Sequence, residues 1–456
     1  MKTYISFAIL LQLLILAQAD PSTVTGTQGQ DQNKTAATAI KISLSNMGNT
    51  QYLGEIIVGS NNVSVSVVFD TSGSWFWVPT EDSSDKPQLD SVDLYRSTES
   101  LTFNKIKEEN STLLYGKTRI TGSLAYETIS FGQNRIRVKN HTILLSKARQ
   151  FEDESNTHGV FGLGLSNVNG HSSILETMKA QNLIQNRMFS VYLEDNINAW
   201  KTNDSEIMFG GFDPTKFKGK PIYAPLVNTK SWAVRLLDMR VGNTSLLQST
   251  RNKTQQSSSS SRETMNFSAL IDTSSNYLVI PSNAINDLIA HLRVEHQIEC
   301  YYLNDNFPVC ACALNDPYEF PNITISLEKD TLFLEPNAYI RRNGGVCSIL
   351  LSALDPQEDQ TRWKFGNVFL RAYYTIFDAD KLQIGFAAAN HKVSKPLSFL
   401  NAAYVAFVFI LLLLIIGFFV MVLKNLCGGK DRVQEVGDDS ALPIMSPSRG
   451  GTNASL

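Results

Sequence analysis

Alternating apolar and polar residues dominate the chain between residues 42 and 390. Because successive side chains of a strand point to opposite faces, this alternation predicts half-buried β-strands. Only the stretches 172–184 and 282–294 have helical spacing, and Ser172 and Ser282 are placed to cap them. The predicted fold class is therefore all-β with few short helices. The clearest strand patterns are YLGEIIVG (52–59), VSVSVVFD (63–70), GSLAYETISFG (122–132), RMFSVYLED (187–195), EIMFGGF (206–212) and AVRLLDMRVG (233–242).

The N-terminal residues have a different pattern. Residues 1–19 start with one basic residue, Lys2, continue with an apolar stretch and end in Ala17-Gln18-Ala19. This is the pattern of a secretory signal peptide cut after Ala19. A buried N-terminal strand or helix is the alternative interpretation. Residues 20–41 then form a short segment ahead of the first strands.

A second apolar run, AAYVAFVFILLLLIIGFFVMVL at 402–423, carries no charge. At about 1.5 Å per residue it is long enough to cross a membrane as a helix. A lipid-anchor signal fits less well, because the chain continues to residue 456. Together with the signal peptide, the run predicts a single-pass type I membrane protein of the secretory or endolysosomal pathway or the cell surface. Residues 391–401 are then a juxtamembrane stalk, and 424–456 a cytosolic tail.

Length and charge narrow the class of protein further. The chain has 456 residues, enough for two ordinary domains, and we expect them at 42–222 and 223–390. The net charge of −3 gives no reason to expect a nucleic-acid partner, which would require a basic face. The Ser-rich stretch 243–266 lacks periodicity and is expected to be an exposed insertion loop.

Four of the five cysteines lie close together in the sequence, at Cys300, Cys310, Cys312 and Cys347. An oxidising lumen favours two disulfides here. Three pairings are possible, of which we prefer Cys300–Cys310 with Cys312–Cys347. The absence of a C-x-x-C pair and of suitably spaced histidines argues against a metal site. The fifth cysteine, Cys427, follows the apolar run and is either acylated or a free thiol.

Acceptor sequences for N-glycosylation are dense in the predicted ectodomain, which fits a lumenal or extracellular surface. The sites are Asn33, Asn62, Asn110, Asn140, Asn203, Asn243, Asn252, Asn266 and Asn322.

A short motif that occurs twice in the sequence indicates the chemistry. An apolar-apolar-Asp-Thr-Ser pattern occurs as VFDTS, with Asp70, and again as LIDTS, with Asp272. Each is followed by an apolar stretch that ends in proline, WFWVP and YLVIP. One such triplet is common in turns. Two in the same frame, one in each predicted half, indicate a duplicated unit.

Two strand-end aspartates that face each other cannot both ionise easily, so they share one proton. The ionised partner can activate water, and the protonated partner can protonate an amide carbonyl oxygen. Neither a metal nor a cofactor is needed for this reaction. The repeated motif therefore predicts a pair of carboxylates that catalyses amide hydrolysis.

The ordered motifs resemble those of pepsin-like aspartic proteases of the A1 type, and in particular membrane-anchored members. The resemblance covers about residues 42–390 and implies a bilobal fold of two duplicated β-barrel-like lobes. It rests on YLGEIIVG (52–59), VVFDTSGSWFWVP (67–79), LLYGKTRITGSLAYETISFG (113–132), HGVFGLGLSN (158–167), RMFSVYLED (187–195), IMFGGFDPTKFKGKPIYAPL (207–226), ALIDTSSNYLVIP (269–281) and WKFGNVFLRAYYTIFDADKLQIGFA (363–387).

The resemblance implies roles for the matching positions of the two loops. Asp70 and Asp272 would hold the lytic water. Thr71 and Thr273 would link the loops through hydroxyl-to-backbone hydrogen bonds. Ser275 would donate to the outer oxygen of Asp272.

The resemblance also assigns a flap. Tyr115, followed by Gly116, would close over the substrate with support from Trp77. Cys312–Cys347 resembles the disulfide of the family's second domain.

The chain departs from the family at the glycine that usually follows each aspartate by two residues. Ser72 and Ser274 stand there instead, and Gly73 replaces a hydroxyl residue. The added Cβ costs little where φ is negative and more where it is positive. Asp70 would lose one hydrogen bond unless Ser72 or Ser74 supplies it.

The sequence thus predicts an aspartic endopeptidase of the EC 3.4.23 type with a monomeric ectodomain. It would hydrolyse polypeptide substrates at acidic pH with water activated between two aspartates. A catalytically silent peptide-binding glycoprotein on the same fold is the alternative, and a purely structural glycoprotein is a third hypothesis. A metalloprotease does not fit, because His291, Glu295 and His296 do not form H-E-x-x-H. A serine hydrolase would need a G-x-S-x-G elbow, which the chain lacks.

Overall fold

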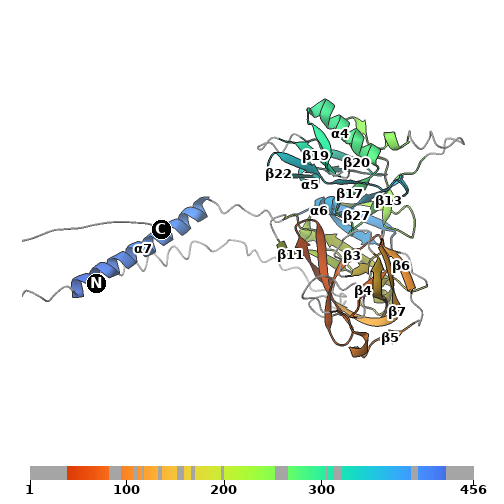
Figure 1. Cartoon of the computed structure of the whole chain (residues 1–456), viewed down its shortest axis with the longest axis horizontal. Coiled ribbons are helices and arrows are strands. Elements are labelled where there is room, and N and C mark those ends of the chain that lie inside the picture. The colour runs from red at the N-terminus through yellow and green to blue at the C-terminus, as the bar shows by residue number, and fades with distance from the viewer. Residues whose placement is uncertain are drawn as a thin grey trace, which may run out of the picture. The chain divides into compact units, whose positions relative to one another are not determined.

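The chain divides into two compact units, one ending at His391 and one beginning at Lys392 (Figure 1). The computed structural model describes residues 39–81, 94–106, 111–115, 118–131, 136–150, 159–165, 170–196, 200–251, 265–303, 307–312, 320–391 and 399–427. The first unit is mostly β in these ranges. The predicted signal peptide and residues 428–456 of the predicted cytosolic tail lie outside the described residues.

A 14-stranded sheet forms the largest part of the first unit. It combines strands from the N-terminal part of the chain with two from its C-terminal end. In spatial order the strands are β12 (Phe217–Pro225), β27 (Gln383–Ala389), β26 (Tyr373–Asp378), β10 (Met188–Tyr192), β11 (Trp200–Phe209), β1 (Ile40–Met47), β2 (Gln51–Val58), β3 (Val63–Asp70), β9 (Val160–Gly162), β4 (Phe76–Pro79), β8 (Ile136–Gln150), β7 (Thr118–Phe131) and β5 (Asn104–Lys105), with β6 (Ser111–Tyr115) paired to β7.

Three smaller sheets lie in the C-terminal half, in the upper part of Figure 1. The first is β13 (Ala233–Arg235), β16 (Ser268–Ile271), β25 (Arg362–Phe365), β17 (Leu278–Ile280) and β24 (Leu351–Ala353). The second is β15 (Thr244–Ser245), β14 (Asp238–Val241), β20 (Ile323–Ser326) and β21 (Thr331–Leu334). The third is β18 (Cys300–Leu303), β19 (Phe307–Ala311), β23 (Val346–Ile349) and β22 (Ile340–Asn343).

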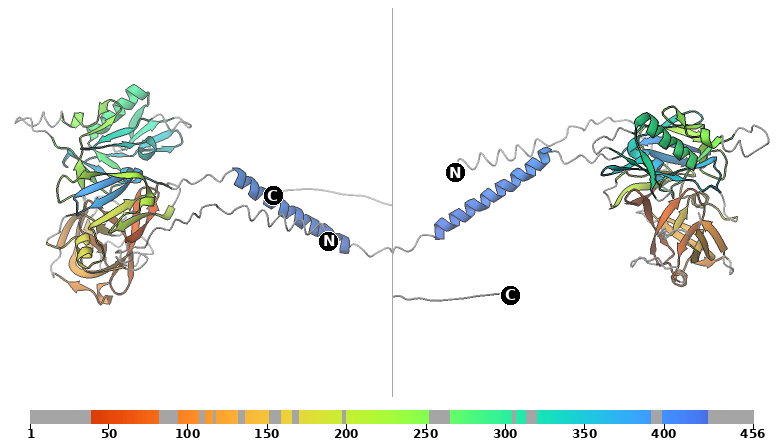
Figure 2. Two further views of the ribbon diagram at one scale, coloured as in Figure 1. Left: turned by 180° about the vertical axis from the view of Figure 1, so that it is seen from behind. Right: turned by 45° about the horizontal axis from the view of Figure 1, so that its top comes forward.

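The first unit has few helices among its strands, and the views of Figure 2 show the same mostly β arrangement. They are α2 (Ile174–Ala180), α4 (Ser282–His296), α5 (Pro336–Tyr339) and α6 (Asn367–Ala372), with 3₁₀ turns η1 (Ser97–Glu99) and η2 (Pro214–Lys216). The prediction of a mostly β fold with few helices is confirmed.

Both predicted helix caps are wrong by one residue. Ser173, not Ser172, caps α2, because its side chain accepts from the Glu176 amide while the Glu176 carboxylate accepts from the Ser173 amide. Ser282 is the first residue of α4 rather than its cap. The Pro281 carbonyl accepts hydrogen bonds from the amides of Ala284 and Ile285 in the first turn of α4. The cap position therefore falls on Pro281.

The predicted strand at 233–242 is two strands in the structure. β13 pairs with β16, whereas β14 pairs with β20 in another sheet. The chain changes sheets at Leu236 and Leu237, whose amides donate to the carbonyls of Phe267 and Ser326. The alternation alone could not reveal this change, because each half keeps the strand pattern.

The cysteine pairs of the structure are the preferred pairs of the sequence analysis. Cys300–Cys310 joins the facing strands β18 and β19. Cys312–Cys347 spans 35 residues and ties the end of β19 to β23. Both bonds therefore lie in one small sheet and hold three of its four strands together.

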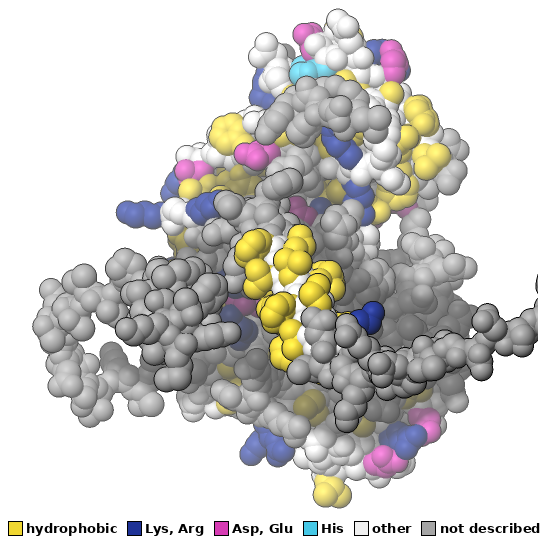
Figure 3. All heavy atoms as spheres, turned by 90° about the vertical axis from the view of Figure 1, so that its left-hand side faces the viewer, with side chains coloured by type: hydrophobic (Ala, Val, Ile, Leu, Met, Phe, Trp, Pro, Cys, Tyr) yellow, Lys and Arg dark blue, Asp and Glu magenta, His cyan; other side chains and the backbone are white. Residues whose placement is uncertain are grey.

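The second unit contains α7 (Phe399–Cys427), which includes the whole predicted span 402–423. By length and composition the stretch Phe407–Lys424 is apolar enough to cross a membrane. Its side chains are exposed, and they form the yellow group in the centre of Figure 3.

Candidate active site

Asp70 is the last residue of β3, at the point where two parallel strands meet an antiparallel one. β3 runs parallel to β9, and β4 pairs with β9 from the other side. The Leu163 amide donates to the Asp70 carbonyl at 2.7 Å, which fixes the backbone of the loop. The Asp70 side chain is fully buried, so the apolar strand delivers a carboxylate into the interior.

Asp272 follows β16 in the same arrangement. β16 runs parallel to β25, and β17 pairs antiparallel with β25. The Asp272 amide donates to the Phe365 carbonyl at 3.0 Å, and the side chain is buried. The Asp-Thr-Ser motif that is repeated in the sequence therefore corresponds to a strand arrangement that is repeated in the fold.

Two glycines allow the strands to approach these loops closely. A Cβ at Gly162 would lie 2.4 Å from the Ser74 carbonyl carbon, and one at Gly366 would lie 2.3 Å from the Ser275 oxygen. Both partners are backbone atoms, so neither could move aside easily. Glycine is therefore required in these two motifs, because a side chain would clash with the backbone of the loops that carry the aspartates.

The two loops are joined by a pair of threonines. The Thr71 hydroxyl donates to the Ile271 carbonyl at 2.6 Å and accepts from the Thr273 amide at 3.0 Å. The Thr273 hydroxyl donates to the Phe69 carbonyl at 2.5 Å and accepts from the Thr71 amide at 3.0 Å. Because the bonds are buried and reciprocal, they hold the loops of the two halves against each other.

The serines that depart from the family pattern bond directly to the aspartates. Ser72 donates to Asp70 Oδ1 from its amide and from its hydroxyl, both at 2.7 Å. Ser274 donates to Asp272 Oδ1 from its amide at 3.0 Å and its hydroxyl at 2.7 Å. Neither serine has a positive φ. The added side chains therefore cause no backbone strain, and Ser72 supplies the hydrogen bond that Gly73 cannot.

Gly73 has a purpose that the sequence analysis missed. A Cβ at this position would lie only 2.7 Å from Asp70 Oδ2. That oxygen is buried and accepts no hydrogen bond from the described residues. The Ser-Gly order therefore moves the hydroxyl to Oδ1 and leaves room beside Oδ2.

The expected role of Ser275 differs from what the structure shows. Its hydroxyl donates to the Tyr277 carbonyl at 3.2 Å, within its own turn. The hydroxyl that bonds Asp272 comes from Ser274, one residue earlier. Because Ser274 carries a side chain where a glycine was expected, it takes the position that Ser275 would otherwise serve.

The electrostatics distinguish Asp70. Burial and, secondly, the nearby charge of Asp272 raise the pKa of Asp70 to about 6. The hydroxyls of Ser72 and Ser274 act in the opposite direction, because they stabilise the ionised form. Asp70 therefore holds its proton to a higher pH than an ordinary aspartate does, because its pKa is raised.

Tyr115 ends β6 and lies close to this pair of aspartates. Its ring contacts Trp77 edge to face, with centroids 6.2 Å apart. Burial and, secondly, the charge of Asp70 raise the pKa of the Tyr115 hydroxyl well above its usual range. The structure thus brings together Tyr115, Trp77 and both aspartates, whereas Gly116 lies outside the described residues.

A second tryptophan, Trp232, also supports the site and was not anticipated. Its indole Nε1 donates to the Leu163 carbonyl at 2.8 Å, and Leu163 in turn bonds Asp70. The ring is fully buried. No motif surrounds Trp232 in the sequence, so only the folded chain reveals this link between the halves.

Comparison with known proteins agrees with this geometry. The family model of the eukaryotic aspartyl proteases matches residues 51–389. The chain belongs to the eukaryotic aspartyl protease family. Cathepsin E-A of Xenopus laevis is 26% identical over 357 residues, covering 75% of this chain and 81% of that protein. Gastricsin of Macaca fuscata fuscata is 26% identical (74% and 84% covered), and pepsin A of Rhinolophus ferrumequinum 27% (75% and 82%).

This aspartyl protease is therefore an aspartic endopeptidase of the pepsin type and acts on polypeptides. In the part of the chain that the structure describes, no group of three or more His, Cys, Asp or Glu side chains is arranged to hold a metal ion.

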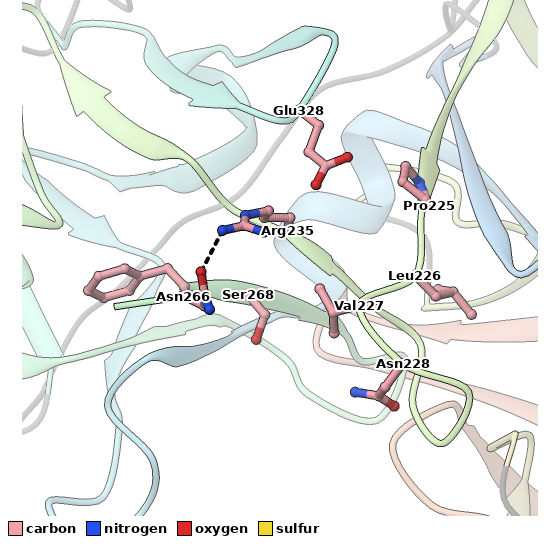
Figure 4. Close-up of a pocket in the computed structure, with 9 residues that line it drawn as sticks. Pro225, Leu226, Val227, Asn228, Arg235, Asn266, Ser268 and Glu328 are labelled. Carbon is pink, nitrogen blue, oxygen red and sulfur yellow. Dashed lines mark hydrogen bonds between the residues drawn. The ribbon is translucent and has the colours of Figure 1, made fainter. Parts of the chain in front are cut away.

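The aspartyl protease has a separate surface hollow of about 460 Å³ in its C-terminal half. Arg235, Asn266 and Glu328 line it, with the Arg235 guanidinium donating to the Asn266 side chain (Figure 4). Neither aspartate takes part in its lining, so the hollow is distinct from the candidate active site.

The glycosylation sites remain predictions, with partial structural context. Asn62, Asn140, Asn243, Asn266 and Asn322 are exposed. Asn203 lies in β11, and its side chain is not described. Asn33, Asn110 and Asn252, like most of the stretch 243–266, lie outside the described residues.

Proposed function

We propose that Asp70 and Asp272 are the catalytic carboxylates of this endopeptidase and act together on a water molecule. The observation that carries the proposal is the reciprocal Thr71–Thr273 hydrogen bonding, which joins two buried strand-end aspartates from repeated units. Such a pair shares one proton, so that one member is an acid and the other a base.

In the proposed mechanism, Asp272 is the ionised partner and Asp70 the protonated one. Asp272 accepts a proton from water as the water oxygen attacks the scissile carbonyl carbon. Asp70 donates its proton to the carbonyl oxygen, which gives a tetrahedral diol. Collapse of the diol breaks the C–N bond: one diol hydroxyl returns its proton to Asp70, and the proton gained by Asp272 passes to the leaving amine. The reaction needs no metal and no covalent enzyme intermediate.

The pH range of activity follows from this assignment. The mechanism needs Asp70 protonated, and its pKa is raised to about 6. Activity is then lost as pH rises through about 6, which places the working range on the acidic side. The Asp70 pKa supports the acidic range that the sequence analysis expected.

Tyr115 is proposed to close over the bound peptide, with the Trp77 ring behind it. Its closeness to both aspartates supports this position at the reacting centre. Closure would exclude water and strengthen the electrostatic interactions of the site.

The finer topology is also proposed. The repeated strand arrangement around Asp70 and Asp272 supports two duplicated lobes within the first unit. We infer that α7 anchors the protein as a type I membrane protein, with a monomeric, glycosylated protease ectodomain in the lumen of the secretory or endolysosomal pathway or outside the cell. The two disulfides fit such an oxidising compartment.

The test is cleavage of denatured haemoglobin between about pH 3 and 6, with and without pepstatin. Asp70→Asn and Asp272→Asn should each abolish pepstatin-sensitive cleavage. Asp330→Asn, at an exposed position away from both loops, should leave it intact. If the unmodified protein binds peptides but shows no inhibitable cleavage, the catalytically silent alternative replaces this proposal.

A further inference from the structure

The surface hollow of about 460 Å³ lies between segments that are far apart in the chain (Figure 4). Residues 225–228 include the end of β12, and residues 266–268 include the start of β16. Arg235 ends β13, and Glu328 lies in the turn between β20 and β21. The volume is within the range of small-molecule sites, roughly 300–1,000 Å³. The hollow is therefore large enough to hold a small organic ligand.

The lining of the hollow combines apolar and charged side chains. Pro225, Leu226 and Val227 are apolar, and Val227 is 44% exposed. Arg235 and Glu328 bring opposite charges to the same hollow (Figure 4). Because these charges offset each other, the hollow favours a neutral polar ligand over an anion such as phosphate. A neutral ligand with an apolar face and several hydrogen-bonding groups matches such a lining.

Asn266 borders the hollow and begins the acceptor sequence Asn266-Phe267-Ser268. The Arg235 guanidinium donates to the carbonyl oxygen of the Asn266 side chain, Oδ1. The sugar of an N-linked glycan is joined to the other polar atom of the same amide, Nδ2. The bond to Arg235 therefore fixes the plane of the amide without blocking the atom that carries the sugar.

Attachment of a glycan keeps this arrangement. Nδ2 forms a bond to C1 of the sugar and gives up one hydrogen as a proton. The lipid-pyrophosphate carrier of the sugar is the leaving group and keeps the electron pair of the broken C–O bond. The amide retains one N–H and its Oδ1, which still accepts from Arg235.

The backbone around Asn266 is held in place by β13. Ser268 lies opposite Arg235 in the pairing of β13 with β16. The Phe267 carbonyl accepts from the Leu236 amide at 3.0 Å, and Phe267 is buried. A held attachment point leaves the first sugar few orientations, so its docking costs little conformational entropy.

The apolar part of the lining is also held in place. The Val227 amide donates to the Ala233 carbonyl at 2.9 Å. The Leu226 amide donates to the Leu382 carbonyl at 2.9 Å. Ala233 is the first residue of β13, and Leu382 directly precedes β27. The hollow is therefore formed before any ligand binds, as is usual for small-molecule sites.

We propose that the hollow binds the first N-acetylglucosamine of a glycan attached to Asn266. This sugar is neutral, its ring has an apolar face of C–H groups, and its hydroxyl and acetamide groups form hydrogen bonds. The C–H face packs on Val227, and the polar groups bond with Arg235 and Glu328. The inference goes beyond peptide hydrolysis and rests on the proposed lumenal, glycosylated ectodomain.

Docking of this sugar affects the strand that leads to Asp272. β16 starts beside the hollow at Ser268 and ends at Ile271, directly before Asp272. The sugar contacts the start of this strand and also residues 225–228, which lead from β12 toward β13. It therefore holds the outer end of the strand that delivers one of the two aspartates.

The test measures how fast peptide N-glycosidase removes each glycan from the full-length protein in detergent. This enzyme cuts the bond between sugar and asparagine, so it has to reach the first sugar. It converts the asparagine to aspartate, and mass spectrometry therefore reads each site separately. Asn140 and Asn322 are the reference sites, since both are exposed and neither lines the hollow.

The native protein should lose the glycan of Asn266 about tenfold more slowly than those of the reference sites, because the docked sugar is accessible only about a tenth of the time. After denaturation all sites should react at the same rate. Arg235→Ala/Glu328→Ala should bring the native rate at Asn266 to that of the reference sites. Val227→Asp should do the same, since it alters the apolar part of the lining and keeps both charged side chains.

The matched control is Arg293→Ala/Glu299→Ala, which removes an exposed arginine and an exposed glutamate that pair with each other elsewhere. It should keep the slow release at Asn266. Each variant should keep the circular dichroism spectrum of the unmodified protein, which shows that it is folded.

Three results would overturn the inference. The first is an unmodified Asn266 in a protein that is glycosylated at a reference site. The second is equal release from Asn266 and the reference sites in the native protein. The third is slow release that survives in both Arg235→Ala/Glu328→Ala and Val227→Asp. A protein without a glycan at any site would contradict the proposed lumenal ectodomain together with the inference, whereas a failure to cleave haemoglobin would concern the proposed dyad alone.

Discussion

At the scale of single residues, the exchange of serine and glycine after Asp70 changes how the carboxylate is held. Both donors of Ser72 converge on Oδ1, while Gly73 keeps the space beside Oδ2 open. The sequence showed the exchange but not this result, because the direction of a hydroxyl depends on the folded loop. The positions of the two aspartates, by contrast, could be read from the repeated motif.

We predict that Ser72→Gly moves the alkaline limb of the kcat/KM profile upward by about one pH unit. The Ser72 hydroxyl stabilises ionised Asp70, so its removal raises the pKa of Asp70 further. The protonated form that the mechanism needs then persists to higher pH. Profiles measured between pH 3 and 8 check this result. Ser275→Ala is the control, because its hydroxyl bonds to Tyr277; an unmoved limb in Ser72→Gly would contradict the assignment.

His141 is a second residue whose environment matters for an acidic enzyme. It is buried, its ring nitrogen Nδ1 lies 3.2 Å from the Thr177 hydroxyl, and burial lowers its pKa to about 4. The folded state therefore binds a proton less readily than the unfolded state, whose histidine titrates at the ordinary value of 6.5. Stability falls as pH drops from 6.5 to about 4 and is no longer affected by His141 below that range.

This loss should amount to roughly 3 kcal/mol of the free energy of unfolding. Urea unfolding at pH 7.0 and pH 4.0 measures it. His141→Gln should show a smaller difference between the two pH values than the unmodified protein. His296→Gln, at an exposed histidine, should show the same difference as the unmodified protein. Equal pH dependence of all three proteins would refute the explanation.

At the scale of elements, strand and helix positions followed from local patterns, but their ends and partners did not. The helical stretch at 172–184 is real, yet α2 begins only after Ser173. Adjacent serines give the same local signal, and only the reciprocal bonds with Glu176 decide between them. Similarly, the split of 233–242 into β13 and β14 depends on partners far away in the chain.

The cap of α2 gives a direct test. Ser173→Ala should lower the free energy of unfolding by about 1 kcal/mol, because the Glu176 amide loses its acceptor. Ser172→Ala, one residue earlier, should change it by less than about 0.5 kcal/mol. Urea denaturation at pH 6 compares the two. A larger loss from Ser172→Ala would return the cap to the position that the sequence suggested.

At the scale of the whole molecule, the two units separate at His391 and Lys392. The sequence predicted this division from the charge-free run, since composition alone marks a membrane-length helix. It did not predict the 14-stranded sheet, in which β26 pairs with β10 although the two strands are far apart in the chain, with Met188 opposite Asp378. The alternation of apolar and polar residues within a strand does not indicate which distant strand it pairs with.

We predict that a protein ending at His391 is secreted in soluble form and keeps the kcat/KM of the full-length enzyme on core peptides. The described part of the first unit includes both aspartates and all four disulfide cysteines. Ultracentrifugation of culture medium and membranes, followed by peptide assays, checks both parts. Loss of activity with retained solubility would show that α7 contributes more than an anchor.

The place of β26 and β27 in the large sheet also has a consequence for timing during synthesis. These strands are made last in the first unit, yet they lie between β12 and β10, which were made much earlier. The sheet stays incomplete until residue 389 has left the ribosome, and α7 follows within ten residues, at Phe399. The large sheet is therefore completed only after both aspartates have been made and shortly before the apolar helix α7.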